Sequence, residues 1–221
     1  MYKQKLKYLF LIICVPLFAQ ENLNQTDDQG RRHGDWKINF EGSNEVKFEG
    51  TFHHGKETGE FKFYKKGSQE HPTAIMQFQD ESLAKATYYT QEGKPISQGM
   101  MKNKQREGEW VYFHNKSEAT MMVENYSEGK LNGFQITYFP DGGTAEKTEY
   151  KNGKKNGESL IYGKNGQVLQ ELNYKNDELH GPANYFNAAG EKLIEGEYQE
   201  GRKTGRWRYF EKGELNEQKD Y

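Results

Sequence analysis

Histidines are the side chains of this chain that most readily bind metals or transfer protons at neutral pH. There are six: His33, His53, His54, His71, His114 and His180. His33 and His180 each precede a glycine, in segments far apart along the sequence. Neighbouring side chains of a strand point to opposite faces, so His53 and His54 are not expected to bind the same metal ion. We therefore expect solvated turn histidines and no metal ligands.

Other catalytic patterns are missing from the sequence. It contains no Walker loop, nucleophile elbow or His-Glu-x-x-His motif. Its many carboxylates show no regular spacing that would indicate a catalytic pair of the glycosidase type. The Gly-x-x-x-Gly pattern at 30–34 and 201–205 resembles a phosphate-binding loop. It recurs along the chain at the turns between predicted strands, so we interpret it as a turn motif. Cys14 is the only cysteine and lies in the N-terminal segment. We expect no catalytic residues, no cofactor and no enzymatic activity.

A repeat of about 24 residues organises the chain. The second glycine of the Gly-x-x-x-Gly turn is its anchor, and the anchors are Gly34, Gly59, Gly108, Gly133, Gly157, Gly181 and Gly205. Successive anchors are 25, 49, 25, 24, 24 and 24 residues apart. The gap of 49 holds two periods, with a degenerate copy centred on Lys85 near residues 78–101. A fixed period predicts about eight structural repeats over residues 30–221.

A second series supports this count. A large apolar residue stands seven positions before each anchor from the second repeat onward: Phe52, Phe78, Met101, Tyr126, Tyr150, Tyr174 and Tyr198. Within a repeat, apolar and polar residues alternate, as in Trp36, Ile38 and Phe40. This period of two predicts half-buried strands, so each repeat is a β-hairpin.

Two repeats break the alternation. Ile136 and Leu160 stand one residue later after their anchors than Trp110 does after Gly108. A slip of one residue turns a side chain to the other face of a sheet, so we expect a β-bulge or a shifted turn in these repeats.

The segments 48–59 and 194–205 carry an aromatic-x-Gly-x-aromatic-x-x-Gly-x-x-x-Gly pattern or a close variant of it. They resemble the MORN (membrane occupation and recognition nexus) repeat in its bacterial variant. The resemblance implies an all-β fold, an elongated single antiparallel sheet of about eight consecutive hairpins forming an open solenoid. It also implies a scaffold, a membrane-proximal tether or a partner-binding surface, and some bacterial relatives are antitoxins. Because the MORN repeat itself has no catalytic residues, the resemblance implies none in this chain.

The first twenty residues are typical of a signal peptide. Lys3, Lys5 and Lys7 precede an apolar run from Tyr8 to Ala19 that is too short to span a bilayer comfortably. An uncleaved anchor is the alternative interpretation. Residues 21–29 then form a polar tail. We expect export to the periplasm, the cell surface or the medium of a bacterium.

Seven aromatic residues are candidates for a partner-binding face: Trp36, Phe61, Trp110, Tyr112, Tyr185, Trp207 and Tyr209. They either pack across strands and hold the sheet together, or form an exposed face that grips a peptide or glycan. Both interpretations stay open from the sequence.

The chain has a net charge of -2, which argues against nucleic acid as a partner. Lys56, Lys130, Lys154 and Arg202 form a basic row that we expect to be a solvated edge of the sheet. Its attraction to anionic lipid would be weak, about 1 kcal/mol of binding free energy per basic residue. We expect a non-enzymatic scaffold with a protein partner. The alternatives are an antitoxin or immunity-like protein that neutralises one toxin, and an envelope module associated with membrane or glycan.

Overall fold

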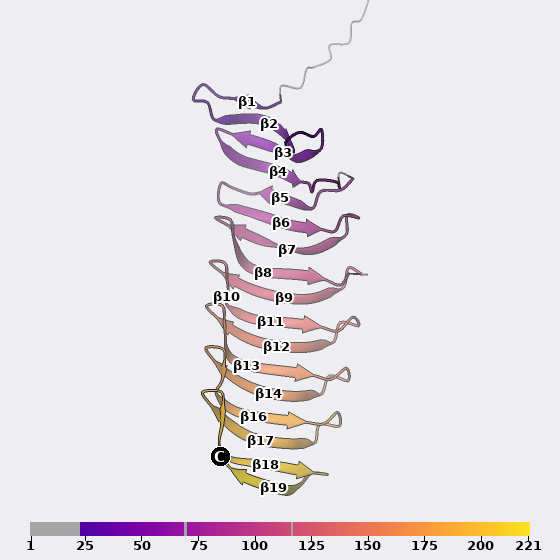
Figure 1. Ribbon diagram of the computed structural model, residues 1–221, viewed down its shortest axis with the longest axis vertical. Helices are drawn as coiled ribbons and strands as arrows, with labels where there is room; N and C mark the ends of the chain where they lie inside the picture. The colour runs from indigo at the N-terminus through magenta and orange to yellow at the C-terminus, as the bar shows by residue number, and fades with distance from the viewer. Residues whose placement is uncertain (1–22, 69, 116) are drawn as a thin grey trace, which may run out of the picture.

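The computed structural model describes residues 23–68, 70–115 and 117–221, so the predicted signal segment at 1–20 and Cys14 lie outside the described residues. These residues form one long, open antiparallel sheet (Figure 1). They contain no helix that could span a membrane. The strands are β1 (Gln25–Thr26), β2 (Arg32–Asn39), β3 (Val46–His53), β4 (Lys56–Phe63), β5 (Ala74–Phe78), β6 (Leu83–Tyr89), β7 (Pro95–Lys102), β8 (Gln105–Phe113), β9 (Thr120–Ser127), β10 (Lys130–Leu131), β11 (Gly133–Tyr138), β12 (Thr144–Lys151), β13 (Lys154–Tyr162), β14 (Val168–Lys175), β15 (Glu178–Leu179), β16 (Gly181–Phe186), β17 (Lys192–Gln199), β18 (Arg202–Glu211) and β19 (Glu214–Asp220).

The sheet is a series of hairpins that follow one another in chain order. Apart from β1 and the two-residue strands β10 and β15, the strands of the described chain pair as eight hairpins, from β2–β3 to β18–β19. Each hairpin pairs with the next through antiparallel hydrogen bonds, as β3 does with β4. The predicted fold class is confirmed.

Most turns that follow the second strand of a hairpin contain two residues, whereas the one from β5 to β6 contains four. In the loop from β3 to β4, His54 and Gly55 have φ angles of 48° and 88°. Asn152 and Gly153 have φ angles of 52° and 84°. Two successive positive φ angles are typical of the type I′ turn, whose twist matches that of the flanking strands. In these turns the residue before the glycine, His54 or Asn152, also adopts the left-handed conformation.

The repeat period follows from a pairing across the strands. Each regular anchor glycine lies directly opposite the large apolar residue of the following strand, as in Gly34 with Phe52, Gly59 with Phe78, Gly108 with Tyr126, Gly133 with Tyr150, Gly157 with Tyr174 and Gly181 with Tyr198. In the degenerate copy, Ala84 lies opposite Met101, whereas Lys85 lies opposite Met100. The position of the missing anchor is therefore Ala84, which corrects the sequence-based centre at Lys85.

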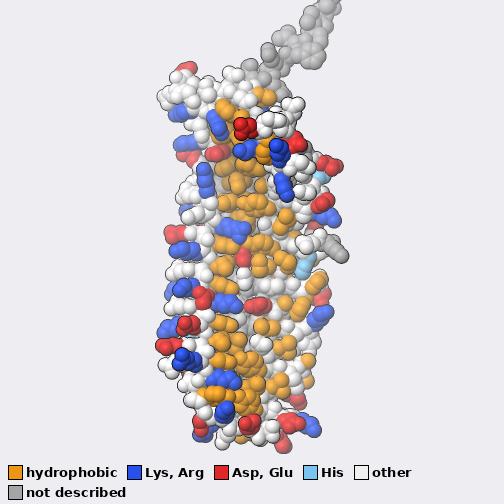
Figure 2. Space-filling view, in the orientation of Figure 1, with side chains coloured by type: hydrophobic (Ala, Val, Ile, Leu, Met, Phe, Trp, Pro, Cys, Tyr) orange, Lys and Arg blue, Asp and Glu red, His pale blue; other side chains and the backbone are white. Residues whose placement is uncertain are grey.

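The buried side chains all lie on one side of the sheet. Residues directly opposite each other on paired strands share a face, and the registers place the buried residues on the face of Phe61, Trp110 and Trp207. They are Phe52, Phe61, Ala74, Ala84, Ala86, Ser97, Trp110, Glu124, Thr148, Ser159, Leu172, Ala183 and Trp207. We call this side the aromatic face and the other the polar face. Figure 2 shows hydrophobic side chains in a stripe along the aromatic face, with Lys and Arg side chains among them.

The two repeats with slipped aromatics keep the common register. Bulges occur in their hairpins, as between Thr137 and Tyr138, but an equivalent shift occurs in the regular β8–β9 hairpin. The buried positions are instead taken by polar residues, so Thr148 lies opposite Gln135 and Ser159. The Oγ1 of Thr148 and the Oγ of Ser159 are 2.8 Å apart. The expected bulge is present in both hairpins, but it also occurs in regular repeats. It therefore does not explain the slip: the register is the common one, and Ile136 and Leu160 lie on the polar face.

The segment expected to be a polar tail contributes to the sheet. Strand β1 pairs with β2, with Gln25 opposite His33. The indole Nε1 of Trp36 donates to the carbonyl oxygen of Gln25 at 2.9 Å, and the backbone N–H of Lys37 donates to Oδ1 of Asn24 at 2.9 Å. Residues 24–26 therefore extend the first hairpin.

Candidate functional site

Three of the largest rings lie flat on glycines of the preceding strand. The exposed fractions of Phe61, Trp110 and Trp207 are 1%, 0% and 1%. A Cβ atom built on Gly50, Gly99 or Gly196 would overlap the Phe61, Trp110 or Trp207 ring, respectively. The described residues form a single sheet with no second layer over it. The rings are therefore buried against the sheet itself, in the space left by the missing glycine side chains.

Cations lie over the two tryptophan rings. The guanidinium carbon of Arg106 lies 4.4 Å from the Trp110 ring centroid, and Lys203 Nζ lies 4.1 Å from that of Trp207. A cation over an aromatic face is stabilised by the ring quadrupole. The shared signal in the sequence is a basic residue two positions before the anchor glycine, found at Arg32, Arg106, Lys155 and Lys203. These cations stand one position after those of the basic row Lys56, Lys130, Lys154 and Arg202, which was expected to be a solvated edge.

A buried carboxylate collects polar groups near the middle of the aromatic face. Glu124 is 7% exposed. Its Oε2 accepts hydrogen bonds from the phenols of Tyr112 (2.5 Å) and Tyr126 (2.7 Å), and its Oε1 accepts one from Gln135 Nε2 (2.8 Å). Arg106 Nη1 donates to both phenols, at 2.5 and 2.8 Å. Burial, followed by the bond to Glu124, raises the pKa of the Tyr112 phenol well above its usual range. This network crosses β8, β9 and β11 and fixes the side chains of Tyr112 and Tyr126.

We expect Tyr112→Phe to lower the free energy of unfolding by at least about 1.5–3 kcal/mol, the range for one hydrogen bond to a charged group, because the change removes the bonds with Glu124 and Arg106. Denaturant unfolding followed by circular dichroism measures it. Tyr88→Phe is the matched control, since within residues 23–68, 70–115 and 117–221 the Tyr88 phenol has one weak hydrogen bond, to Met101 Sδ at 3.9 Å. Equal stability losses in the two variants would contradict the proposed role of the network.

The seven predicted aromatic residues divide by exposure. Phe61, Trp110 and Trp207 are buried, whereas Trp36, Tyr112, Tyr185 and Tyr209 are half-buried. The Tyr185 phenol lies 3.5 Å from that of Tyr198, and the Tyr209 phenol lies 3.4 Å from that of Tyr221. The registers place all seven on the aromatic face, in five hairpins along the sheet. They form an extended row, with the buried members packing the sheet and the half-buried ones accessible.

The row is interrupted by a hollow in the degenerate repeat. Ala84 and Ala86 occupy the aromatic face there. The regular repeats carry a glycine at the first position, and the repeats anchored at Gly34, Gly59, Gly108 and Gly205 carry a large ring at the second. The hollow has a volume of about 590 Å³, and its apolar lining is Phe63, Met76, Phe78, Ala84 and Met101. Glu57, Glu81 and Lys104 also line it. The small residues Ala84 and Ala86 thus leave an apolar hollow in the repeat that the sequence shows only as degenerate.

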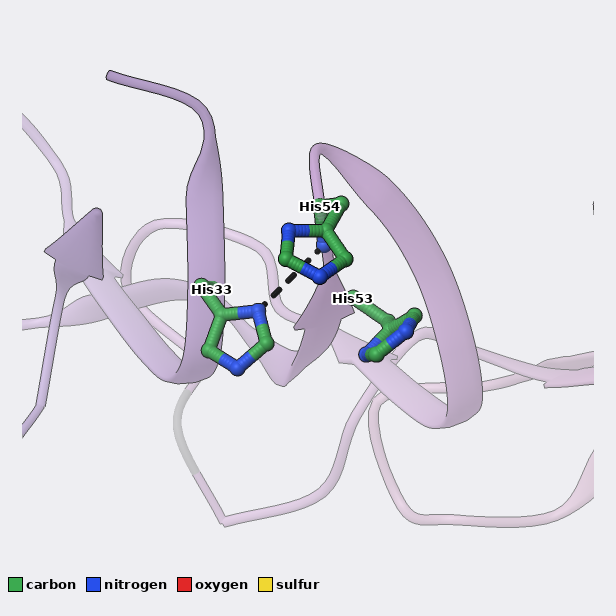
Figure 3. A group of neighbouring side chains, drawn as sticks. All are labelled: His33, His53 and His54. Carbon is green, nitrogen blue, oxygen red and sulfur yellow. Dashed lines mark hydrogen bonds between the residues drawn. The ribbon is translucent and has the colours of Figure 1, made fainter. Parts of the chain in front are cut away.

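The structure also brings together three histidines on the polar face near β1. One nitrogen from each of His33, His53 and His54 lies within 4.8 Å of the others, and the rings surround a common space (Figure 3). The ring centroids of His53 and His54 are 4.5 Å apart. The prediction that these two side chains point apart is wrong, because the φ of 48° at His54 takes it out of the extended strand.

Asp27 holds the ring of His54 in place. Its Oδ2 accepts a hydrogen bond from His54 Nδ1 at 2.6 Å, and its Oδ1 accepts from the backbone N–H groups of Gln29 and Arg31 at 2.9 and 3.0 Å. The bond from His54 is the main cause that holds the pKa of the Asp27 carboxyl well below its usual range, with the bonds from Arg31 and Gln29 adding to it. Asp27 is therefore an ionised, fixed acceptor.

No protein-family model matches this sequence, and comparison with curated proteins gives no match.

Proposed function

We propose that this chain is an exported, non-enzymatic MORN-type repeat protein whose aromatic face binds a protein partner. Its repeat pattern and its sheet of successive hairpins support the assignment to this class of scaffold. The half-buried tyrosines, together with the Lys and Arg side chains over the rings, offer a partner apolar contact and hydrogen bonds. Aromatic and arginine side chains are the types that contribute most to protein binding.

The hollow in the degenerate repeat carries this proposal. Two methionines, Met76 and Met101, face it, and thioether side chains adapt their shape to varied apolar partners. It lies on the aromatic face and is lined by Phe63 and Phe78. An apolar side chain of the partner inserts here, while the row of aromatic residues on both sides positions the rest of the partner.

Two neighbouring residues of β5 provide the test. Met76 lies opposite Phe61 on the aromatic face, and Ile75 lies opposite Lys62 on the polar face; both are half-buried. Proximity crosslinking in the native envelope, read by mass spectrometry, identifies the partner. We expect Met76→Glu to lose it, because the charge would have to be desolvated against the partner's apolar group, and Ile75→Glu to keep it. Thermal unfolding of both variants checks that their folds are intact.

The opposite pattern, with Ile75→Glu losing the partner and Met76→Glu keeping it, would place binding on the polar face and overturn the proposal. Capture of no protein at all would also contradict it. The identity of the captured protein separates a scaffold from the antitoxin alternative, in which a single toxin is recovered. Co-sedimentation with liposomes or peptidoglycan, with no protein captured, would favour the membrane or glycan alternative.

A further inference from the structure

The histidine cluster of the first two hairpins has the features of a metal site. Its three imidazoles come from two adjacent strands and a rigid turn: His33 from β2, His53 from the end of β3, and His54 from the type I′ turn that follows. The ring centroids of His33 and His54 are 4.8 Å apart, and those of His33 and His53 are 5.4 Å apart. The hairpin geometry therefore holds three potential nitrogen ligands around one space.

Asp27 sets the tautomer of His54. Nδ1 of His54 lies 2.6 Å from Asp27 Oδ2 and 3.0 Å from Arg31 Nη2. A carboxylate only accepts hydrogen bonds and its contact is the shorter one, so we assign the proton to Nδ1, with the Arg31 guanidinium donating to Asp27. The lone pair of the neutral ring is then on Nε2, and Figure 3 shows the second nitrogen of His54 directed toward the space between His33 and His53. Metal-binding histidines typically donate their other N–H to a carboxylate in this way.

His33 offers a lone pair on the same side. Its Nδ1 accepts a hydrogen bond from the backbone N–H of His54 at 3.4 Å, a long and weak contact that is easily given up. Arg31 lies nearby, but its guanidinium pairs with Asp27 Oδ2 at 2.8 Å, which offsets the charges of these two residues. The cluster is thus a set of imidazoles next to a neutralised ion pair, and imidazole ligands suit zinc, copper or nickel better than calcium or magnesium.

The remaining coordination geometry is within reach. Nitrogens bound tetrahedrally to one zinc ion are about 3.4 Å apart, given Zn–N bonds of about 2.1 Å. The three nitrogens, now within 4.8 Å, close this gap through side-chain rotation, since His53 and His54 are exposed. A hollow of about 360 Å³ borders His53 and His54 and leaves room for a further ligand.

We propose that His33, His53 and His54 bind a divalent transition-metal ion, zinc fitting best, with Asp27 orienting His54. The site lies on the polar face, so it is independent of partner binding by the aromatic face. The bound metal would tie β2 of the first hairpin to the end of β3 and to the turn that follows it.

Calorimetric titration of the untagged chain with Zn²⁺ tests the proposal. The variants His33→Thr, His53→Gln and His54→Asn use residues that other repeats carry at the same positions, such as Thr204, Gln199 and Asn152, so the turns and strands stay intact. We expect one Zn²⁺ per chain, and a loss of affinity of at least about 10-fold in each variant. Asp27→Asn is expected to weaken binding by about 10–100-fold through the orientation of His54.

His180→Thr is the matched control, because His180 occupies the position of His33 in another repeat but has no histidine neighbour in sequence. It is expected to leave Zn²⁺ affinity unchanged. The proposal is overturned if the chain binds no Zn²⁺, if binding survives the three histidine substitutions, or if Mg²⁺ competes equally with Zn²⁺.

Discussion

Replacing Trp110 with alanine is expected to lower the free energy of unfolding by about 3–5 kcal/mol, the range for removing a large buried aromatic ring. Trp110 is 0% exposed. Its ring lies on Gly99, contacts Tyr88 and Tyr126 at centroid distances of 6.1 and 6.5 Å, and donates from Nε1 to the Met100 carbonyl at 3.0 Å. The loss should therefore affect the strands on both sides. Denaturant unfolding measures its size.

Trp36→Ala is the control for this prediction. Trp36 is a tryptophan at the same position of its repeat, but it is half-buried, so its truncation is expected to cost clearly less, about 1–2 kcal/mol. Hydrogen exchange shows where the effect lies: in a linear array, each repeat contacts mainly its neighbours. We expect Trp110→Ala to speed exchange in β6–β9 and leave β16–β19 nearly unchanged. Equal stability losses for the two variants would contradict the role assigned to burial of Trp110.

Adding one methyl group at Gly99 is the second large expected effect. The Cβ of Gly99→Ala would overlap the Trp110 indole, and overpacking of this kind costs about 2–3 kcal/mol. Gly143→Ala is the matched control, because its Cβ would meet nothing closer than the end of the Asp141 side chain at 3.3 Å. Gly143 also has no positive φ. Thermal and denaturant unfolding of the two variants give the comparison.

The double variant identifies the cause. If the cost of Gly99→Ala comes from contact with the indole, the same change made in Trp110→Ala should cost almost nothing, because the overlapping ring is gone. A double-mutant cycle measures this coupling. Additive losses would show that Gly99 is needed for its backbone freedom and not for its contact with Trp110.

The repeat period and the alternation of residue types were enough to predict the fold. Anchors such as Gly108 and apolar residues such as Tyr126 recur at a fixed spacing because they lie opposite each other on paired strands. Both signals come from short-range backbone geometry: a hairpin needs a tight turn, and a strand turns successive side chains to opposite faces. The sequence therefore also identified the aromatic residues of the packed face.

The structure was needed where the outcome depended on contacts across strands. The cation over Trp110 comes from Arg106 in the same strand, but the ring is buried only because Gly99 lies beneath it. The hollow beside Met76 depends on Ala84 lying opposite Met101, a register that the weak repeat signal placed one residue away. A small error in register reverses which side chains meet, so these features could not be predicted from spacing alone.

The sequence by itself determined the eight hairpins and the alternating faces of the sheet, since both follow from local preferences repeated at a constant interval. Only the tertiary structure decided how the histidines group. A strand places His53 and His54 on opposite faces, but the left-handed φ of 48° at His54 turns its ring back toward His33 and Asp27. The backbone conformation of the turn at His54 therefore brings its ring next to those of His33 and His53, which spacing along the sequence does not predict.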